Sequence, residues 1–393
     1  MVLSLPLWCF MPEGVKRWEV VVIGGGLAGS AAAIRLAQNG RTVLLLEKQP
    51  VAHDKVCGEF ISSQAQRYLR ELGLDLTALH PEHIANIRLM RGHTIASTQL
   101  PYPGISLSRR VLDEAVLVRA QDQGAQVRRG AAVTAIIKEP TCWRIEVAGH
   151  DAIRSDTVFL ATGKHDLREW RRTGGTQNDY IGFKCHYRLT PTQRAALAGY
   201  VEMTLFDGGY AGLEPVEDGK TNLCMVVAKR QFGMYGKSWD GLLRAILNAT
   251  PLLAERLEGA QPCWPRPLSV YGIPYGFVYR VPSSASQDLY RLGDQMAVIP
   301  SFSGYGMSIA LYTAFLAVDC HLQGDANLYH RQARSNLLPL IRSASVLSKL
   351  AEYPFAQRSM LCACSIRPEL ITFLARHALS KKLLHASIPS ATI

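Results

Sequence analysis

The chain has 393 residues, of which 48% are hydrophobic and 19% are charged, and this balance excludes a largely disordered protein. Its formal net charge of +11 favours anionic partners, namely nucleotide cofactors, an acidic carrier protein or an anionic membrane surface. The charge is not accompanied by a zinc-finger or RNP-like signature, so nucleic acid is not expected among the partners.

The cysteines and the first residues indicate the compartment. The nine cysteines form no C-x-x-C pair, so no metal site is expected, and a reducing cytoplasm is the simplest location. The apolar stretch MVLSLPLWCFM has no basic segment and no small-residue cleavage site, which argues against a signal peptide and leaves Met11 as an alternative start. No apolar run approaches the roughly 20 residues of a membrane-spanning helix. We therefore expect a cytoplasmic protein that is at most peripheral to a membrane.

The first predicted elements form a βαβ unit. Residues 18–23 are an apolar, Val/Ile-rich run typical of a buried parallel strand. The Ala-rich segment that follows favours a helix, and Gly40 stands where a left-handed residue would end it. Residues 41–47, RTVLLLE, predict a second buried strand that ends in an acid.

The turn between the first strand and the helix has a G-x-G-x-x-G pattern formed by Gly24, Gly26 and Gly29. Such glycines provide a tight turn, let the backbone approach a pyrophosphate and allow close helix packing, while the helix N-terminus faces the phosphates. Glu47, at the end of the second strand, is placed to accept hydrogen bonds from both ribose hydroxyls, which favours a 2′-hydroxyl over a 2′-phosphate. These residues alone fit either FAD or NAD.

The remaining elements follow in three groups. Residues 105–130 predict a helix and a glycine-ended turn, before strands near 131–137, 142–149 and 156–163. Strand-and-turn patterning between 180 and 230 predicts antiparallel hairpins of an inserted substrate domain. Helices over 239–260, an aromatic broken strand over 270–280 and a strand, loop and apolar helix over 289–319 come next, and the chain beyond about 325 is predicted to be helical.

Four separated motifs between residues 18 and 324 point to a known group. They are the nucleotide unit ending in Glu47, KVCGEF at 55–60, SRRVLD with Arg109 and Asp113 in R-x-x-x-D spacing, and GDQMAVIPSFSGYGM, in which Gly293, Asp294, Pro300, Gly304 and Gly306 have the spacing G-D-x5-P-x3-G-x-G. With these motifs the sequence resembles the flavoprotein hydroxylases of the p-hydroxybenzoate hydroxylase fold, and within that fold the geranylgeranyl reductase-like and flavin halogenase-like branches.

The resemblance implies an α/β protein with a Rossmann-like FAD-binding domain and an interleaved antiparallel-sheet substrate domain. The expected division is an N-terminal extension at 1–17, a discontinuous FAD-binding domain at 18–175 and 286–325, a substrate domain at 176–285 and a helical C-terminal segment at 326–393. The cofactor is then FAD. The residues expected to contact it are Gly24, Gly26, Leu27, Ala28, Gly29, Glu47, Lys48, Lys55, Cys57, Arg109, Thr162, Gly163, Gly293, Asp294, Gly304, Gly306 and Met307.

The fourth motif has a physical interpretation of its own. Asp294, at the end of a strand, can accept hydrogen bonds from ribityl hydroxyls, and the small residues let the backbone approach the flavin edge. A helix is predicted from about Met307, with its N-terminal amides directed at the part of the flavin that becomes negative on reduction. This arrangement would make reduction of the cofactor easier.

The sequence departs from the pattern of the hydroxylases in two places. It has ATGKHD, with Thr162 and Gly163, where they have an acidic D-G element, and GDQMA where they have G-D-A-A-H. These departures leave the handling of the nicotinamide donor, NADPH or NADH, open. No W-x-W-x-I-P sequence of the flavin halogenases occurs, so halogenation is not favoured.

Two redox chemistries fit this scaffold. Hydroxylation of an electron-rich molecule by reduced flavin and oxygen is the favoured one, with NADPH or NADH as electron donor. The alternative is the reduction of a carbon–carbon double bond, towards which Cys57 and Glu59 point as candidate catalytic residues. A binding protein that keeps the nucleotide fold without redox work is the third hypothesis.

Aromatic residues of the predicted substrate domain are candidates for the pocket wall. Phe183, Tyr210, Tyr271 and Tyr275 are expected to contact a flat aromatic or lipid-like molecule, and the fragment IGFKCHYRL suggests a polyketide or phenolic lipid. Beyond Tyr329 the chain has many basic and few acidic residues, with Leu370, Phe373 and Leu374 among them. This tail is either a membrane- or carrier-binding surface or a solvated helical face.

Overall fold

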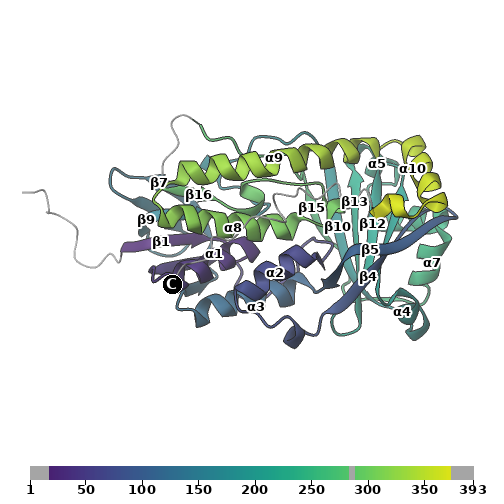
Figure 1. The fold of residues 1–393 in the computed structure, drawn as a ribbon, viewed down its shortest axis with the longest axis horizontal. Coiled ribbons are helices and arrows are strands. Elements are labelled where there is room, and N and C mark those ends of the chain that lie inside the picture. The colour runs from purple at the N-terminus through teal and green to yellow at the C-terminus, as the bar shows by residue number, and fades with distance from the viewer. Residues whose placement is uncertain (1–16, 283–287, 373–393) are drawn as a thin grey trace, which may run out of the picture.

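The computed structural model of the chain describes residues 17–282 and 288–372. Two β-sheets lie end to end along the long axis, and helix α9 (Ala326–Leu350) runs along both of them (Figure 1). The predicted N-terminal extension up to residue 16, the alternative start at Met11, and the tail residues Phe373 and Leu374 lie outside the described residues.

The first sheet has seven strands in the order β6-β2-β1-β9-β8-β7, with β16 paired to β9. Its strands are β1 (Arg17–Ile23), β2 (Val43–Glu47), β6 (Gln126–Arg129), β7 (Val133–Lys138), β8 (Trp143–Val147), β9 (Ile153–Leu160) and β16 (Leu289–Arg291). β1 pairs in parallel with both β2 and β9, and its Val/Ile run is buried as a strand covered on both faces must be. The predicted βαβ unit is confirmed, because α1 (Leu27–Gln38) connects β1 to β2 and Gly40 follows it at a φ of 72°.

The second sheet has nine strands in the order β14-β10-β13-β12-β11-β4-β5-β3, with β15 paired to β10. Its strands are β3 (Phe60–Ile61), β4 (Glu82–Arg91), β5 (Thr94–Ser106), β10 (Tyr180–Arg188), β11 (Tyr200–Phe206), β12 (Gly209–Val216), β13 (Lys220–Ala228), β14 (Gln261–Pro262) and β15 (Leu268–Tyr271). The antiparallel hairpins predicted between residues 180 and 230 are confirmed.

Residues 60–106 differ from the predicted domain division, which placed them with the nucleotide-binding part. In the structure β4 pairs in parallel with β11, with Tyr200 opposite Asn86, and β5 pairs with β4. The second sheet is therefore built from two distant parts of the chain. A pairing across more than 100 residues leaves no local sequence signal, which is why the boundary was not visible.

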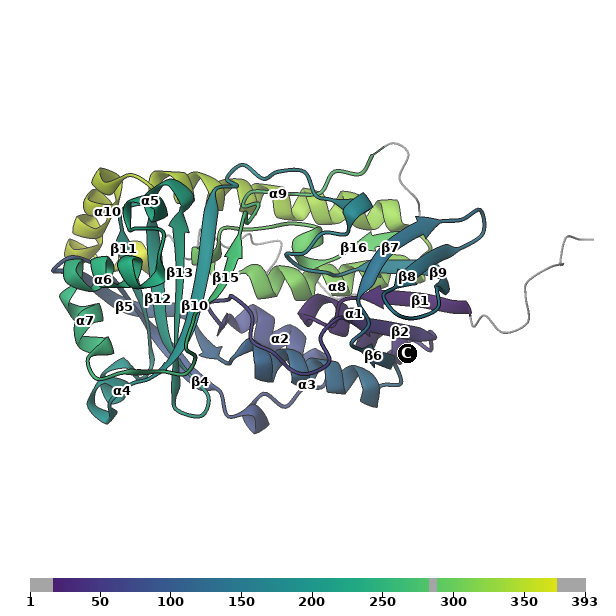
Figure 2. The same ribbon diagram turned by 180° about the vertical axis from the view of Figure 1, so that it is seen from behind.

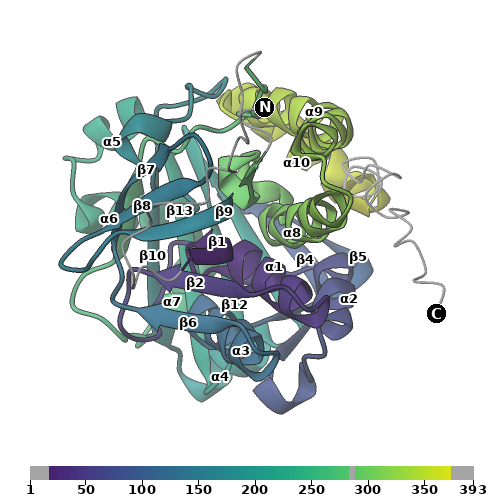
Figure 3. The same ribbon diagram turned by 90° about the vertical axis from the view of Figure 1, so that its left-hand side faces the viewer.

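The helices pack in two groups. Besides α1 and α9, the helices are α2 (Ser63–Glu71), α3 (Arg109–Asp122), α4 (Pro191–Leu197), α5 (Lys229–Met234), α6 (Trp239–Ala249), α7 (Pro251–Leu257), α8 (Gly306–Leu322) and α10 (Pro354–Ile366). α1 packs against α8 and α3 on the first sheet (Figure 3). α5, α6 and α7 lie over β12 and β13 of the second sheet (Figure 2), and their core includes Phe183 and Met225.

Two predictions about the whole chain can be compared with this fold. Among the helices of the described ranges, none is both long enough and apolar enough to cross a membrane. Eight of the nine cysteines are described, and all eight are free thiols.

Candidate functional site

A single cavity of about 870 Å³ lies between the two sheets and touches all four motifs. Gly24 in the first motif and Asp294 in the fourth line the same cavity, although 270 residues separate them in the chain. All the predicted cofactor residues line it except Gly29. The motifs are therefore parts of one site.

The glycines of the first motif have different duties. Gly24 has a φ of 106°, and a Cβ there would lie 2.4 Å from the carbonyl oxygen of Ala161. A Cβ on Gly29 would lie 1.9 Å from the carbonyl oxygen of Gly24, so Gly29 allows α1 to pack against the turn rather than facing the cavity. Gly26 lines the cavity, and a Cβ there would meet no atom nearer than Lys55 Nζ at 3.5 Å. Gly26 is thus the position at which the backbone is open to a ligand.

Glu47 is held in place at the end of β2. Its Oε2 accepts a hydrogen bond of 2.7 Å from the backbone N–H of Gly25, and its Oε1 accepts one of 2.9 Å from the N–H of Gln49. The carboxylate is 8% exposed and lines the cavity. Each oxygen keeps a free lone pair with which it can accept a ribose hydroxyl.

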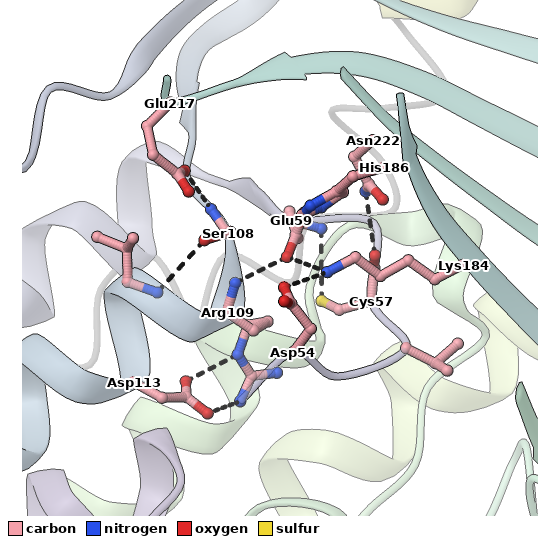
Figure 4. A network of polar contacts seen from close by, with 12 residues as sticks. Asp54, Cys57, Glu59, Ser108, Arg109, Asp113, Lys184, His186, Glu217 and Asn222 are labelled. Atoms are coloured by element: carbon pink, nitrogen blue, oxygen red, sulfur yellow. Dashed lines mark hydrogen bonds and ion pairs between the residues drawn. The ribbon is translucent and has the colours of Figure 1, made fainter. Parts of the chain in front are cut away.

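The second and third motifs meet the first through Asp113. Its carboxylate accepts two hydrogen bonds from Arg109, of 2.8 and 2.9 Å, and one of 2.7 Å from Lys55 Nζ (Figure 4 shows the pair with Arg109). Burial alone would raise the pKa of Asp113, but the two cations lower it to about 2. Since Lys55 Nζ also lies beside Gly26, three motifs that are far apart in the sequence form one charged wall of the cavity.

The fourth motif closes the cavity from the opposite side. Gly293 has a φ of 54°, and a Cβ on it would lie 3.3 Å from the Cβ of Ala28 in the first turn of α1. Its N–H donates a 2.9 Å hydrogen bond to Thr313 Oγ1 of α8. α8 begins at Gly306, one residue before the predicted start, and no side chain caps its N-terminus. The first amides of α8 are therefore available to a ligand.

The two places where the sequence departs from the hydroxylase pattern contact each other. Gln295 Nε2 donates to the carbonyl oxygens of Gly163 and His165, at 2.9 and 3.1 Å, and to Asp166 Oδ1 at 3.1 Å. Arg172 strengthens the link, because it donates to the carbonyl oxygen of Asp294 and pairs with Asp166. ATGKHD and GDQMA thus form one hydrogen-bonded unit.

These features fit FAD. The backbone is open where Gly26, Gly163 and Gly306 line the cavity, since a Cβ on the last two would meet nothing within 4 Å. Neither α1 nor α8 has a side-chain cap at its N-terminus, so both present free amides, as a pyrophosphate and a reduced flavin require. With Glu47 for the ribose, the donors and acceptors of the cavity match an extended flavin dinucleotide.

A buried charged cluster around Glu59 was not expected from the sequence. Glu59 and Lys184 are both 0% exposed, and Glu59 Oε1 lies 2.5 Å from Lys184 Nζ. Glu59 Oε1 also accepts from the N–H of Arg109 at 2.7 Å, and Oε2 lies 2.8 Å from His186 Nε2 (Figure 4). Burial opposes the charge of Lys184, but Glu59 and Asp54 outweigh it and raise the pKa of the lysine. The cluster is therefore a paired set of buried ions.

Two further properties define this cluster. Glu59 has a φ of 65°, a conformation that costs a side-chain-bearing residue free energy and is kept only where the surroundings require it. Ligand atoms of Asp54, Glu59 and His186 lie within 4.8 Å of one another, a spacing suited to a metal ion. The ammonium of Lys184, in contact with both Glu59 and Asp54, provides the positive charge there instead.

The alternation of β10 could have revealed the cluster. Tyr180, Gly182, Lys184 and His186 share one face of the strand by the period of two, and Ile181, Phe183, Cys185 and Tyr187 share the other. The second set packs in the core beneath α5, α6 and α7.

The predicted substrate residues divide accordingly. Tyr210 and Tyr275 line the cavity, and burial raises the pKa of both phenols. Phe183 does not, because it lies on the core face of β10, where it packs against Phe232. Tyr271 does not either, because it is 63% exposed at the end of β15. The predictions for Phe183 and Tyr271 are corrected on these grounds.

The cavity extends beyond the motifs into an apolar region. This region, which we call the apolar chamber, lies between β4, β5 and β11 on one side and α9 and α10 on the other. Its lining residues are Ile87, Leu89, Leu100, Val201, Met203, Leu205, Leu347, Met360 and Ile371. The cavity therefore joins a polar, glycine-lined end to a hydrocarbon-lined end.

Comparisons with known proteins agree with this site. A family model described as FAD dependent oxidoreductase matches residues 19–173. The matched part of the chain, which contains the Gly26 turn, Glu47 and Asp113, is similar to these oxidoreductases. Menaquinone reductase of Mycobacterium tuberculosis is 25% identical over 326 residues, which cover 77% of this chain and 76% of the relative. Digeranylgeranylglycerophospholipid reductase 2 of Methanopyrus kandleri is 28% identical over 324 residues, again 77% and 76%.

The solved structures confirm the predicted fold. The flavin-dependent brominase Bmp2 superposes with a TM-score of 0.74 at 19% identity, over 92% of this chain and 93% of the brominase. The halogenase PltM, in a structure with phloroglucinol and FAD, gives a TM-score of 0.69 at 15% identity, over 85% and 76% of the two chains. At such identities the likeness concerns the fold alone, which is the predicted p-hydroxybenzoate hydroxylase type.

Proposed function

We propose that this oxidoreductase reduces a carbon–carbon double bond of a lipid-like molecule, with FAD as cofactor and NADPH or NADH as electron donor. The observation on which the proposal depends is the continuity of the cavity from the Gly26 turn to the apolar chamber. A long hydrocarbon chain in the chamber would bury the same kind of surface that lines it, and burial of apolar area favours binding by about 25 cal/mol per Å². Two relatives that match three quarters of the chain are named as reductases of lipid-like molecules.

The Cys57 segment shapes the polar end of the substrate region. The Sγ of Cys57 accepts a hydrogen bond of 3.4 Å from the N–H of Glu59, and its carbonyl oxygen accepts one of 3.1 Å from Asn222 Nδ2. Bound and reduced FAD would supply two electrons to the substrate. Cys57 is proposed to contact the reacting part of the substrate, and Glu59, which is occupied by three donors, to hold this segment in position.

Positive charge gathers at the edge of the cavity, where a nicotinamide donor would approach. Lys48, Lys164, His53 and His165 line this edge. Burial and the charge of Lys55 lower the pKa of His53, and burial and the charge of Lys48 lower that of His165. The positive charge at this edge comes from Lys48 and Lys164, and it suits phosphate-bearing ligands, in line with the proposed use of NADPH or NADH.

An anaerobic assay tests the proposed function. The purified yellow protein would be mixed with NADPH or NADH, and bleaching of the flavin absorbance would show that the donor reduces it. Lipid extract would then be incubated with the reduced protein without oxygen, and products two hydrogens heavier would be sought by mass spectrometry. A colourless protein would support the non-redox binding hypothesis, and products that form only with oxygen would exclude reduction.

Hydroxylation of an aromatic or polyketide-derived molecule is the second candidate. The observation that favours it is the pair of buried phenols on the cavity wall, Tyr210 and Tyr275, which suit a flat ring. Its signature in the same assay is oxygen consumption matched by a product one oxygen heavier.

We also propose that the end of the cavity beneath α10 faces an anionic membrane. Four apolar residues around α10 are exposed, namely Tyr353 (64%), Phe355 (81%), Ile366 (75%) and Leu370 (36%). α10 itself contributes Met360 to the apolar chamber, so a lipid could pass from this surface to the cavity. Replacing Phe355 and Ile366 by serine should abolish flotation with anionic liposomes, whereas replacing the exposed Met234, on the far α5 surface, should not.

A further inference from the structure

Glu214 has an arrangement that the proposed roles of Cys57 and Glu59 do not explain. It lies in the middle of β12, is 2% exposed and lines the cavity. Within the described ranges neither of its carboxyl oxygens has a hydrogen-bond partner. Other buried glutamates of this part of the chain have partners, since Glu59 pairs with Lys184, Glu202 pairs with Arg256 and Glu217 accepts from the N–H of Ser108. A buried polar group without a partner costs free energy, so folding alone gives no reason for Glu214 to be there.

Two more unpartnered atoms surround this carboxyl group. Asn222 lies directly opposite Glu214 on β13, and its Oδ1 is buried without a partner in the described structure. The hydroxyl of Ser106 on β5 lies near enough to Glu214 to act on it as a hydrogen-bond donor, which lowers the pKa of the carboxyl group, but among the described residues the buried hydroxyl has no partner at full hydrogen-bond geometry. The three groups come from three different strands and converge beside the Cys57 segment. Of the three residues Glu214 lines the cavity, so its unpartnered carboxyl oxygens can meet a ligand there.

The surroundings determine the charge of Glu214. Burial, followed by the negative charge of Glu59 and the proximity of Cys57, raises its pKa well above the usual range of a carboxyl group. Lys184 acts in the opposite direction, but its ammonium is already paired with Glu59 and Asp54. His186, in the next strand but one, is bound to Glu59. These surroundings favour the neutral form of Glu214, which can donate a hydrogen bond.

We propose that Glu214 is the proton donor of this site and that it binds the carbonyl oxygen of an enone or quinone whose conjugated double bond is reduced. This rests on the proposed function and adds the class of polar group that the lipid-like substrate presents. An isolated alkene has no lone pair for the acid, so it would leave Glu214 unpartnered. A carbonyl oxygen in the cavity accepts a hydrogen bond from Glu214.

The reaction balances as follows. When bound and reduced by NADPH or NADH, FAD would supply a hydride, which is two electrons and one proton, to the β-carbon of the enone. The electrons of the double bond move towards the carbonyl oxygen, which takes the proton of Glu214 and becomes an enol. The enol then places that proton on the α-carbon as the ketone forms again. Glu214 is left as a carboxylate, and solvent restores its proton. The sum is addition of one hydride and one proton across the double bond.

The state of Glu214 can be measured without turnover. The FAD-loaded protein at neutral pH should show an infrared carbonyl band of a protonated carboxylic acid, absent in Glu214→Gln and retained in Glu217→Gln. Glu217 is the matched control, because it is 4% exposed, does not line the cavity and accepts a 2.7 Å hydrogen bond from the N–H of Ser108. If Glu214→Gln leaves the acid region of the spectrum unchanged, Glu214 is not a neutral acid and the proposal is overturned.

Binding tests the carbonyl group directly. The probes are a long-chain alkyl enone and the same molecule with CH2 in place of the carbonyl group. Binding of each probe is followed by the change that it causes in the flavin absorbance spectrum. Glu214→Leu should weaken binding of the enone about tenfold and leave the deoxygenated probe unchanged. Glu214→Gln, which keeps an N–H donor, should restore enone binding but lower the rate of its reduction by about 10²–10⁴-fold. Equal loss for both probes would overturn the proposal.

The two proposals fail differently. If the wild-type protein reduces a double bond anaerobically and Glu214→Gln does so equally fast, the proton-donor role is wrong and the proposed function stands. If the infrared band and the enone selectivity appear as expected but no double bond is reduced, the carbonyl site stands and reduction is wrong.

Discussion

The two ends of the cavity differ in the groups that form them. The nucleotide end is built mainly from backbone: glycines that let chains approach, uncapped helix amides and a carboxylate oriented by N–H groups. The substrate end is built from side chains on the second sheet, with the buried ions around Glu59 and the unpaired acid Glu214. A site built from backbone depends on the order and spacing of residues within one segment. A site built from side chains depends on which strands pair, and these strands can be far apart in the sequence. The first kind is therefore legible in one stretch of sequence, and the second is not.

The largest effect is expected where the side-chain end is broken. Glu59→Gln leaves the ammonium of Lys184 buried with only Asp54 beside it, and removal of one partner from a buried pair costs about 3–5 kcal/mol. Urea unfolding of the variant should show this loss, and the double variant with Lys184→Met should recover much of it. A loss below about 1 kcal/mol in the single variant would mean that the cluster is hydrated rather than buried.

A change at the backbone end should affect the ligand and spare the fold. In Gly26→Ala the new methyl group occupies open space beside Lys55, where the cofactor backbone contact is expected. FAD affinity should fall about 10–100-fold, while the unfolding free energy of the FAD-free protein changes little. Gly40→Ala is the control, because Gly40 does not line the cavity but has a φ of 72°. This variant should lose about 1–2 kcal/mol of stability and keep its affinity for FAD. Titration of the FAD-free protein with FAD measures both.

The wall shared by the motifs should respond to acid. The pKa of Asp113 is lowered from 3.8 to about 2, so its ion pairs contribute fully above pH 3.8 and are lost as the pH falls towards 2. A difference of 3.8 minus about 2 corresponds to about 2 kcal/mol, of which about half should be gone at pH 3. The gap in unfolding free energy between wild type and Asp113→Asn should narrow by these amounts. If the difference in unfolding free energy between wild type and Asp113→Asn were the same at pH 5 and pH 3, the ion pairs of Asp113 would not contribute to stability as predicted.

The smallest effect concerns the link between the two ends of the flavin region. Gln295→Ala removes the hydrogen bonds to Gly163, His165 and Asp166, which should cost about 1–2 kcal/mol. Bleaching by NADPH or NADH should slow more than FAD affinity falls, because the loop with Lys164 and His165 borders the cavity edge. Gln123→Ala, at an exposed hydrogen bond with Gln38, is the control. If the bleaching rate and the FAD affinity fell by the same factor, the substitution would act on the binding of FAD rather than on its reduction by the donor.

The sequence sufficed for the backbone end because each signal there is local. The Val/Ile run, the glycine spacing and the acid at Glu47 lie within 30 residues and predict β1, α1 and β2 directly. Even the fourth motif, which begins about 270 residues later, was recognisable by its own spacing. The structure adds that Gly293 contacts Ala28, which follows from the pairing of β16 with β9.

The side-chain end was predicted less well for a physical reason. The alternation of β10 separates Phe183 from Lys184, but which set faces the cavity depends on where α5, α6 and α7 pack. Glu214 lies in a segment for which the sequence predicts only strands and turns, and its isolation arises from β13 and β5 together. Likewise the hairpin β4–β5 was assigned to the nucleotide-binding part, since its partner β11 follows about 100 residues later.

The left-handed backbone at Glu59 has an evolutionary consequence. Glycine would adopt this conformation at no cost, whereas glutamate adopts it at a cost in free energy. A glutamate can therefore have been accepted there only if a counter-ion for its carboxylate was already present. Lysine first is the less costly order, because Asp54 still gives Lys184 a counter-ion, whereas a carboxylate at position 59 without the lysine would lack the ammonium that pairs with it and would face a buried histidine. The chain thus has a preferred order of mutation, lysine before glutamate, and a reconstructed ancestor with glycine at position 59 should already contain the lysine.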